Sequence, residues 1–318
     1  MTGIADMSKT KKKVNRKKKQ LQLIAILLML LLIAAALTWL TLRGRAMNRA
    51  RTADTTKTLE SAGQTVTGEL GFTGDLTDTY RAAQHVYSHR GSAGDNEHSF
   101  KAYDDAIAAG SIYIEQDLVL SQDGVLFVAH DLSAEPMTGT LGLYSSMSAE
   151  EIDGLKTKAG GKVLRMSEVF DKYGTSVNYV IELKAYEDSR MIDSFKELVD
   201  KYGYQDKIIV QCEDIHPLRK LEDIYPDMTK LYVCRSQWGF DTSINEPYID
   251  IISVKEWLMT EERCKIVHDK GKMFSAWTLD SEKLIRKAID MGVDVYFTND
   301  TPLALSIEKD YGLQKRGE

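Results

Sequence analysis

Cysteine is scarce in this chain, with only Cys212, Cys234 and Cys264 among 318 residues. An odd number cannot make a closed disulfide framework, so at least one thiol is free or bonded to another molecule. None has the CxxC or Cys–His spacing of a zinc site, and we expect ordinary buried thiols. The chain also lacks a GxGxxG or Walker-type loop, so the sequence gives no support to a nucleotide-binding fold.

Net positive charge is missing from most of the chain. The total is −6 at pH 7, but residues 1–51 hold twelve Lys or Arg and one acid, which leaves 29 bases and 46 acids in the remainder. An acidic body lacks the cations that neutralise nucleic-acid phosphates, so we expect no nucleic-acid binding. The composition, 43% hydrophobic and 28% charged, is that of a globular protein.

One long stretch has no charge at all. Residues 21–42 read LQLIAILLMLLLIAAALTWLTL, and as a helix they would span about 33 Å, the thickness of a bilayer core. Eight Lys or Arg precede this stretch and four follow it closely. The excess of basic residues before it predicts a single-pass transmembrane helix in the cell membrane, with residues 1–20 as a basic cytoplasmic tail and the body extracytoplasmic.

A cleaved signal peptide is the alternative interpretation of this segment. Its apolar region would be about 7–15 residues long and would end in small residues at a cleavage site. The present run is longer and is followed by Arg43-Gly44-Arg45, which favours an uncleaved anchor. Residues 43–84 are rich in Thr, Ser, Gly and Asp, and we interpret them as a spacer between the membrane and the domain at 85–318.

Beyond the spacer, short β-branched or aromatic runs alternate with amphipathic stretches. The expected strands are 85–88, 112–120, 125–129, 177–183, 207–212, 230–234, 249–254, 273–278 and 293–298. The expected helices include 99–109, 166–173, 189–202, 217–224, 261–270 and 281–291. Asp123-Gly124 predicts a hairpin between two of the strands. The other eight strands, alternating with helices, predict a closed (β/α)8 TIM barrel.

In such a barrel the active site lies at the carboxyl ends of the strands. Glu115 and Asp117 lie two residues apart in an expected strand, so both side chains point to one face; the same spacing joins Glu182 and Lys184. An ExD pair of this kind also occurs on solvent-facing strands, and the apolar neighbours fit either face. If the pair faces inward, converging carboxylates favour a bound Ca²⁺ or Mg²⁺ over zinc.

Two of the six histidines combine a strand end with a charged follower, namely His89 before Arg90 and His130 before Asp131. A pair of histidines suits proton transfer, because the unperturbed pKa of histidine is near neutrality. We expect the others to be structural (His85), on the surface of helices (His216 and His268) or without a clear assignment (His98).

The ordered motifs resemble those of the glycerophosphodiester phosphodiesterase family. They read YSHRGS at 87–92, NEHSFKAY at 96–103 and YIEQDLVLSQDGVLFVAHD at 113–131, followed by VIELK, AWT and VDVYFTNDTP. The resemblance extends over residues 85–305. It implies a phosphodiesterase barrel that hydrolyses glycerophosphodiesters to an alcohol and glycerol phosphate, through a cyclic phosphate made by the neighbouring glycerol hydroxyl.

The resemblance also implies roles for individual residues. Glu115, Asp117 and Glu182 are the expected ligands of one divalent cation, Ca²⁺ or Mg²⁺. The expected general acid and base are His89 and His130. The remaining expected positions bind the phosphate (Arg90 and Lys184), pack against the alcohol (Trp277) and support the site (Glu97).

Some positions depart from the family pattern. Asn96 and His98 replace the usual Pro and Asn, and the loop after Asp131 lacks an Arg. These changes leave the substrate open. The alternatives are a phospholipase D-like activity on lysophospholipids or sphingolipids, and a barrel without activity that binds anionic lipid or polymer. No obligate protein partner is indicated.

Overall fold

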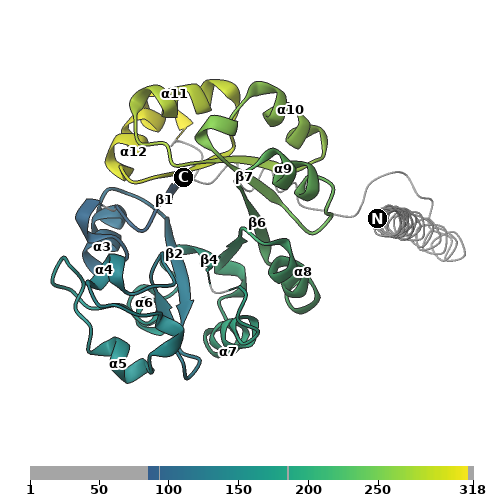
Figure 1. Ribbon diagram of the computed structural model, residues 1–318. Helices are drawn as coiled ribbons and strands as arrows, with labels where there is room; N and C mark the ends of the chain where they lie inside the picture. The colour runs from purple at the N-terminus through teal and green to yellow at the C-terminus, as the bar shows by residue number, and fades with distance from the viewer. Residues whose placement is uncertain (1–84, 93, 185, 314–318) are drawn as a thin grey trace, which may run out of the picture. The chain divides into compact units, whose positions relative to one another are not determined.

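A computed structural model describes residues 85–92, 94–184 and 186–313 (Figure 1). The predicted tail at 1–20, transmembrane helix at 21–42 and spacer at 43–84 all lie outside these residues and remain predictions. Within the described part of the chain, no helix has the length and apolar character needed to cross a membrane.

The described residues form a closed barrel of parallel strands. Each strand pairs with its neighbours in parallel, and pairing of the first strand with both β2 and β9 closes the ring. A further short strand, β3 (Leu126–Val128), is antiparallel to β2 and lies outside the ring. The ring strands are β1 (Val86–Ser88), β2 (Tyr113–Leu120), β4 (Asn178–Leu183), β5 (Ile208–Cys212), β6 (Thr229–Cys234), β7 (Ile251–Lys255), β8 (Met273–Trp277) and β9 (Val295–Thr298).

The alternation of side chains along each strand builds two separate cores. One set fills the inside of the barrel: Tyr87, Tyr113, Val180, Ile209, Leu231, Val233, Ile251, Met273, Val295 and Phe297. The intervening residues face outward and pack under the helices, as Ile114 and Leu118 of β2 do. Because the period is two, the residue two positions beyond an inner residue, toward the carboxyl end of the strand, also points inward.

Eight helices follow the eight ring strands and cover the barrel from outside (Figure 1). In α7, for example, Met191, Phe195 and Val199 are spaced by four residues and are buried, as expected of an amphipathic helix. The helices are α3 (Phe100–Ala108), α6 (Met166–Tyr173), α7 (Met191–Tyr202), α8 (Ile215–Ile224), α9 (Gln237–Ser243), α10 (Glu261–Asp269), α11 (Glu282–Met291) and α12 (Thr301–Asp310).

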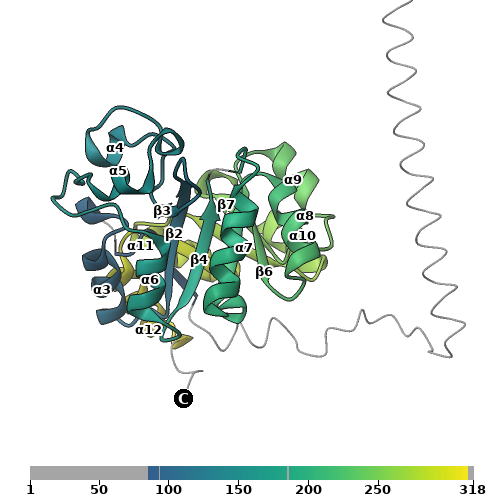
Figure 2. The same cartoon turned by 90° about the horizontal axis from the view of Figure 1, so that it is seen from below.

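An insertion between β3 and α6 carries two short helices, α4 (Glu135–Thr138) and α5 (Ala149–Asp153), on a small core of its own that includes Phe127, Tyr144 and Ile152. Figure 2 shows α4, α5 and α9 at the same end of the barrel. This is the end where the ring strands finish. Strand β1 begins at the opposite end, and α12 returns there from β9.

The predicted (β/α)8 barrel is confirmed. Most strand boundaries agree with the prediction to within one residue, and the Asp123-Gly124 hairpin joins β2 to β3 as expected. The helical pattern of 166–173 is reproduced without change in α6. Helices α9 and α12 and the two helices of the insertion were not among the predicted elements.

Candidate active site

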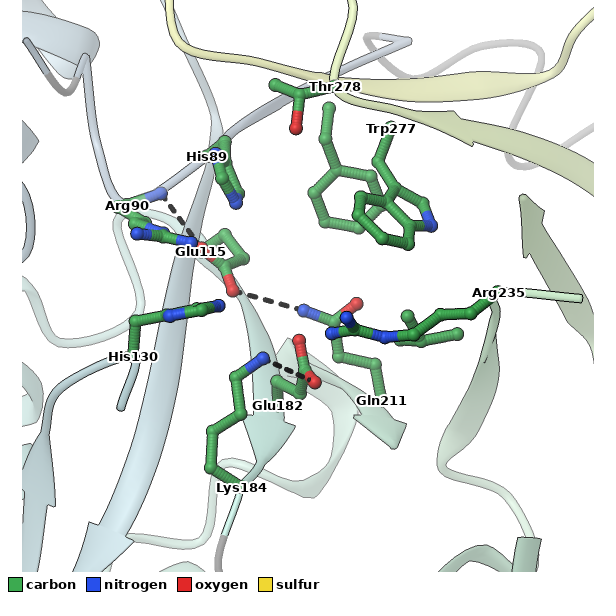
Figure 3. A pocket seen from close by; sticks show the side chains of 12 residues that line it. His89, Arg90, Glu115, His130, Glu182, Lys184, Gln211, Arg235, Trp277 and Thr278 are labelled. Carbon is green, nitrogen blue, oxygen red and sulfur yellow. Dashed lines mark hydrogen bonds and ion pairs between the residues drawn. The ribbon is translucent and has the colours of Figure 1, made fainter. Parts of the chain in front are cut away.

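A pocket opens at the carboxyl ends of the ring strands (Figure 3). The pocket contains about 460 Å³ of empty space, part of which is open to solvent. Most of the residues expected from the sequence meet here. The lining residues are His89, Arg90, Glu115, His130, Glu182, Lys184, Gln211, Val233, Arg235, Trp277, Thr278 and Phe297.

The loop after β1 places Arg90 against the carboxylates. Both Arg90 (φ 56°) and Gly91 (φ 87°) have left-handed backbone conformations. A Cβ at Gly91 would lie 2.7 Å from the carbonyl carbon of Ala102, so only glycine lets α3 pack this closely. The tight turn lets the Arg90 amide donate to Glu115 Oε2 (2.8 Å), while its guanidinium donates to Glu97 Oε2 (2.6 Å). Glu97 therefore holds the Arg90 guanidinium in place.

Strands β2 and β4 bring the acidic residues together. Glu115, Asp117 and Glu182 are all nearly fully buried. Lys184 lies 3.2 Å from Asp117 Oδ1 and 2.7 Å from Glu182 Oε1. Glu115 also accepts a hydrogen bond from Gln211 Nε2 (3.1 Å). The inward orientation of Glu115 and Asp117, which the sequence left open, follows from these contacts.

His98, unassigned from the sequence, belongs to this cluster. It is fully buried, and its Nε2 lies 2.9 Å from Asp117 Oδ2 while its Nδ1 lies 3.1 Å from the Tyr103 hydroxyl. One ligand atom each from His98, Glu115 and Asp117 lie within 4.8 Å of one another, close enough to hold a metal ion. Glu182, the third ligand expected from the sequence, lines the open pocket, whereas His98 contacts Asp117 and, like Asp117, does not line it.

The electrostatics of the acidic residues fit a cation. Burial and the neighbouring Asp117 hold the pKa of Glu115 well above its usual range, and burial raises the pKa of Glu182 to about 7 although Lys184 opposes this. Burial also disfavours the charge on Asp117, but Lys184 and His98 hold its pKa well below the usual range. The neighbouring cationic side chains therefore compensate the charge of Asp117 but not fully those of Glu115 and Glu182. An oxygen-rich, under-compensated cluster of this kind suits a hard divalent ion.

The two expected catalytic histidines contact different side chains through Nδ1. His89 Nδ1 lies 2.7 Å from Asn299 Oδ1, and Asp280 accepts from the Asn299 side-chain amide (2.8 Å), which fixes the amide orientation. His89 therefore donates from Nδ1 and leaves Nε2 free. His130 Nδ1 instead lies 3.3 Å from Asp131 Oδ1. Burial, reinforced by Arg90, lowers the pKa of His89 to about 4; burial also lowers the pKa of His130.

The opposite wall of the pocket contains residues that the sequence analysis did not single out. Trp277 and Arg235 line this wall, with the Arg235 guanidinium 5.3 Å from the centroid of the Trp277 ring. Lys255, outside the lining residues, lies 5.7 Å from the same centroid. The alternation of side chains along a strand could have found both cations and Gln211, because each lies two residues after an inward-facing residue. The pairs are Val233 and Arg235, Ser253 and Lys255, and Ile209 and Gln211.

The remaining histidines and the cysteines lie away from the pocket. His216 is exposed, His268 pairs with Asp294 Oδ2 (2.7 Å) on the outside of the barrel, and His85 bonds the Asp294 carbonyl (2.6 Å). The surface assignments of His216 and His268 are thus confirmed. The three cysteines are free and buried, as expected.

Comparison with known proteins agrees with the geometry. Residues 89–303 match the glycerophosphoryl diester phosphodiesterase family. A glycerophosphodiester phosphodiesterase of Bacillus subtilis is 24% identical over 252 residues, which cover 70% of this chain and 86% of the relative. One of Caldanaerobacter subterraneus is 26% identical over 251 residues, which cover 71% of this chain and 98% of the relative.

Solved structures share the fold. An Oleispira antarctica phosphodiesterase in complex with its product sn-glycerol-3-phosphate superposes with a TM-score of 0.65 at 20% identity, covering 72% of this chain and 98% of the other. An Agrobacterium tumefaciens glycerophosphodiester phosphodiesterase gives a TM-score of 0.62 at 22% identity, covering 71% and 99%. The chain therefore belongs to the glycerophosphoryl diester phosphodiesterase family, a family of phosphoric diester hydrolases.

Proposed function

We propose that this protein hydrolyses glycerophosphodiesters to an alcohol and glycerol phosphate, with the help of one divalent cation. The observation that carries the proposal is a single pocket that His89 and His130 line together with Glu115 and Glu182, and with the cations Arg90 and Lys184 (Figure 3). A phosphodiester has one negative charge and its transition state has more, so this arrangement of cations and proton carriers fits the reaction.

The hydrogen bonds support distinct roles for the two histidines. His89, fixed by Asn299 with Nε2 free, takes the proton from the attacking glycerol hydroxyl. His130, whose imidazolium form the nearby Asp131 carboxylate would stabilise, gives a proton to the departing alkoxide oxygen. A bond from the glycerol oxygen to phosphorus forms as the bond to the alcohol breaks. In the second step, water opens the resulting cyclic phosphate and the two roles exchange.

Glu115, Asp117 and Glu182 are the proposed ligands of the cation, which we take to be Ca²⁺ or Mg²⁺. His98 keeps Asp117 oriented from behind. When bound, the cation neutralises charge on the phosphate oxygens. Arg90 and Lys184, already in contact with the carboxylates, bind the same phosphate from the protein side.

The direct test is product analysis with the full-length protein in detergent. Incubation with glycerophosphocholine, glycerophosphoethanolamine and glycerophosphoglycerol should release glycerol phosphate, and chelation should stop the release until Ca²⁺ or Mg²⁺ is restored. Binding of the substrates without any hydrolysis would support the alternative of an inactive binding barrel instead.

Phospholipase D-like hydrolysis of an acylated substrate is the second candidate. Large apolar side chains are exposed at the end of the barrel where the pocket opens: Leu141 is 83% exposed, Trp238 74% and Trp257 61%. Such side chains could contact an acyl chain. Release of the head group from lysophospholipids or sphingolipids, with no activity on the deacylated diesters, would favour this candidate.

We also propose that residues 21–42 anchor the protein in the cell membrane with the barrel outside the cytoplasm. The surplus of Lys and Arg before residue 21 supports this orientation. Protease added to intact cells should remove the barrel and leave a small membrane-bound fragment. A barrel that stays protected until the cells are lysed would contradict the proposed orientation.

A further inference from the structure

A second group of cations adjoins the pocket, separate from those that face the carboxylates: Arg235 lines the pocket, and Lys255 lies next to the lining residue Trp277 without lining the pocket itself. Arg235 and Trp277 lie across the pocket from Arg90 and His130 (Figure 3). The Arg235 guanidinium and the Lys255 ammonium are 5.3 and 5.7 Å from the centre of the Trp277 ring, within cation–π range. The aromatic surface on this wall is therefore already engaged by two cations of the protein itself.

This group has a net positive charge. Arg235 forms an ion pair with Glu213, whose other oxygen accepts from the Tyr186 hydroxyl at 3.1 Å. In the described part of the chain, Lys255 forms no ion pair. One carboxylate thus faces two cations, and the wall opposite the phosphate-binding residues attracts negative charge.

The strand register explains why both cations reach this place. Val254 of β7 is opposite Cys234 of β6, and Lys255 is opposite Trp277 of β8. Arg235 follows directly after β6, so it projects over the same edge. The Trp277 indole is held by a hydrogen bond from Nε1 to the Ser253 carbonyl (3.3 Å). The ring and its two cations therefore form a preorganised surface.

We infer that Arg235 and Lys255 determine the choice of substrate, and select glycerophosphodiesters whose alcohol carries a second phosphate group. A trimethylammonium head group would normally bind an aromatic face, but here it would meet two like charges. A second phosphate would instead meet Arg235 across the pocket from the scissile phosphate, with the positive charge of Lys255 close by next to Trp277. The inference rests on the proposed hydrolysis of glycerophosphodiesters.

The test compares two substrates on one enzyme preparation. The full-length protein is assayed for kcat/KM on glycerophosphocholine and on a glycerophosphoglycerol whose terminal hydroxyl bears a phosphate, with glycerophosphoglycerol as the neutral reference. Wild type should prefer the phosphorylated substrate over glycerophosphocholine. Arg235→Gln and Lys255→Gln should each reduce that preference by about two- to fivefold, the range of a partly exposed ion pair, and the double variant by about tenfold. Added salt should weaken the preference.

A matched control is available on the outside of the barrel. Arg219 also pairs with a glutamate, Glu246, and stacks over a tyrosine, Tyr248, at 5.6 Å, but it does not line the pocket. Arg219→Gln should leave the preference unchanged. The ratio of two kcat/KM values is insensitive to incomplete folding or metal loading.

The possible results distinguish a failure of the inferred substrate preference from a failure of the proposed hydrolysis. A wild-type preference for glycerophosphocholine, or an unchanged ratio in the double variant, would overturn the inference while leaving the hydrolysis intact. Absence of hydrolysis of all three substrates by the wild type would instead refute the proposed function.

Discussion

At the scale of single residues, the pocket depends on side chains that hold other side chains. Asn299 and Asp280 orient His89, Glu97 holds Arg90, and His98 holds Asp117. Asn299 is far from His89 in the sequence, and His98 is 19 residues from Asp117. Glu97 instead lies in the loop that follows Arg90. Loss of a support should therefore lower activity without removing a reacting group.

The paired histidines give the first prediction. His89→Ala or His130→Ala should each lower kcat by about 10²- to 10⁴-fold, because each removes one proton transfer. The double variant should lose far less than the product of the two single losses, since both act in one step. On a substrate with a nitrophenyl leaving group, which needs little protonation, His130→Ala should recover and His89→Ala should not.

His216 provides the control, because its side chain is 77% exposed and away from the pocket. His216→Ala should leave kcat unchanged. Equal loss of activity in His89→Ala and His130→Ala on both substrates would contradict the assigned roles. His268 is less suitable, because its partner Asp294 also accepts from the amide of Phe274 (2.7 Å).

The second prediction concerns the cation. Glu115→Gln and Asp117→Asn each remove one carboxylate from the cluster, and should weaken the binding of Ca²⁺ or Mg²⁺ by at least tenfold in calorimetric titrations. His98→Ala should weaken it less, because His98 touches Asp117 from behind and leaves the carboxylates in place. If His98→Ala abolishes binding while Glu182→Gln has no effect, His98 rather than Glu182 is the third ligand.

Sequence reasoning found the side chains that point inward from strands, and missed those whose position depends on loops. Glu115 and Asp117 share a strand and a face, so their spacing alone brings them together. His98 lies on an irregular segment with φ 55°, and its contact with Asp117 joins residues 19 apart. No periodicity predicts such a contact. Arg235 and Lys255 follow the alternation of side chains along a strand, but they lie at strand ends outside the family motifs.

At the scale of elements, the turn between β1 and α3 is the tightest point of the site. The third prediction is that Gly91→Ala destabilises the protein by about 2–4 kcal/mol, because its Cβ would collide with the backbone of Ala102. Activity should fall as well, since Arg90 precedes this position. Thermal unfolding and kcat measure the two effects.

Gly271 is the matched control for this change. It also has a left-handed backbone (φ 69°), but nothing lies within 4 Å of a Cβ built there. Gly271→Ala should therefore destabilise by only about 1 kcal/mol and leave kcat unchanged. Similar losses for both variants would mean that the close contact with α3 does not matter.

The elements themselves were largely predictable from the sequence. Runs of β-branched residues and helices with clear caps mark the alternation, and Gly203 and Gly292 end α7 and α11 in left-handed conformations. Helix α9 was missed because it is short and its Trp238 side chain is exposed, so its apolar pattern is weak. Helix α12 follows β9 directly and was missed although its start signal is present, because Asp300 caps the helix by accepting from the Leu303 amide and Pro302 lies in its first turn.

At the scale of the whole molecule, α12 ties the end of the chain to the start of the barrel. It contacts β1 and carries Glu308, which is 1% exposed and accepts a hydrogen bond from the Tyr296 hydroxyl at 3.3 Å. Burial raises the pKa of Glu308 from 4.5 to about 7. The folded state therefore favours the protonated form of Glu308. The contribution of this neutral acid to the stability of the fold is complete below pH 4.5 and is lost as the pH rises toward 7.

The fourth prediction follows from this sign. Glu308→Gln should stabilise the protein by about 2–3 kcal/mol at pH 8 and have little effect at pH 4.5, because the amide stays neutral throughout. Denaturant unfolding of the variant and the wild type at both pH values gives the difference. Glu197→Gln, at an exposed position on α7, should show no such pH dependence. A stabilisation of Glu308→Gln that is equal at both pH values would contradict a buried, titrating Glu308.

The return of α12 to the starting end of β1 has a practical consequence. Both ends of the described domain lie at the base of the barrel, away from the pocket. Coupling to a bead, a sensor chip or a fusion protein through either end would leave the entrance facing the solution. A barrel that begins at residue 85 and ends at residue 313 can therefore be immobilised by either end with equal access for substrate.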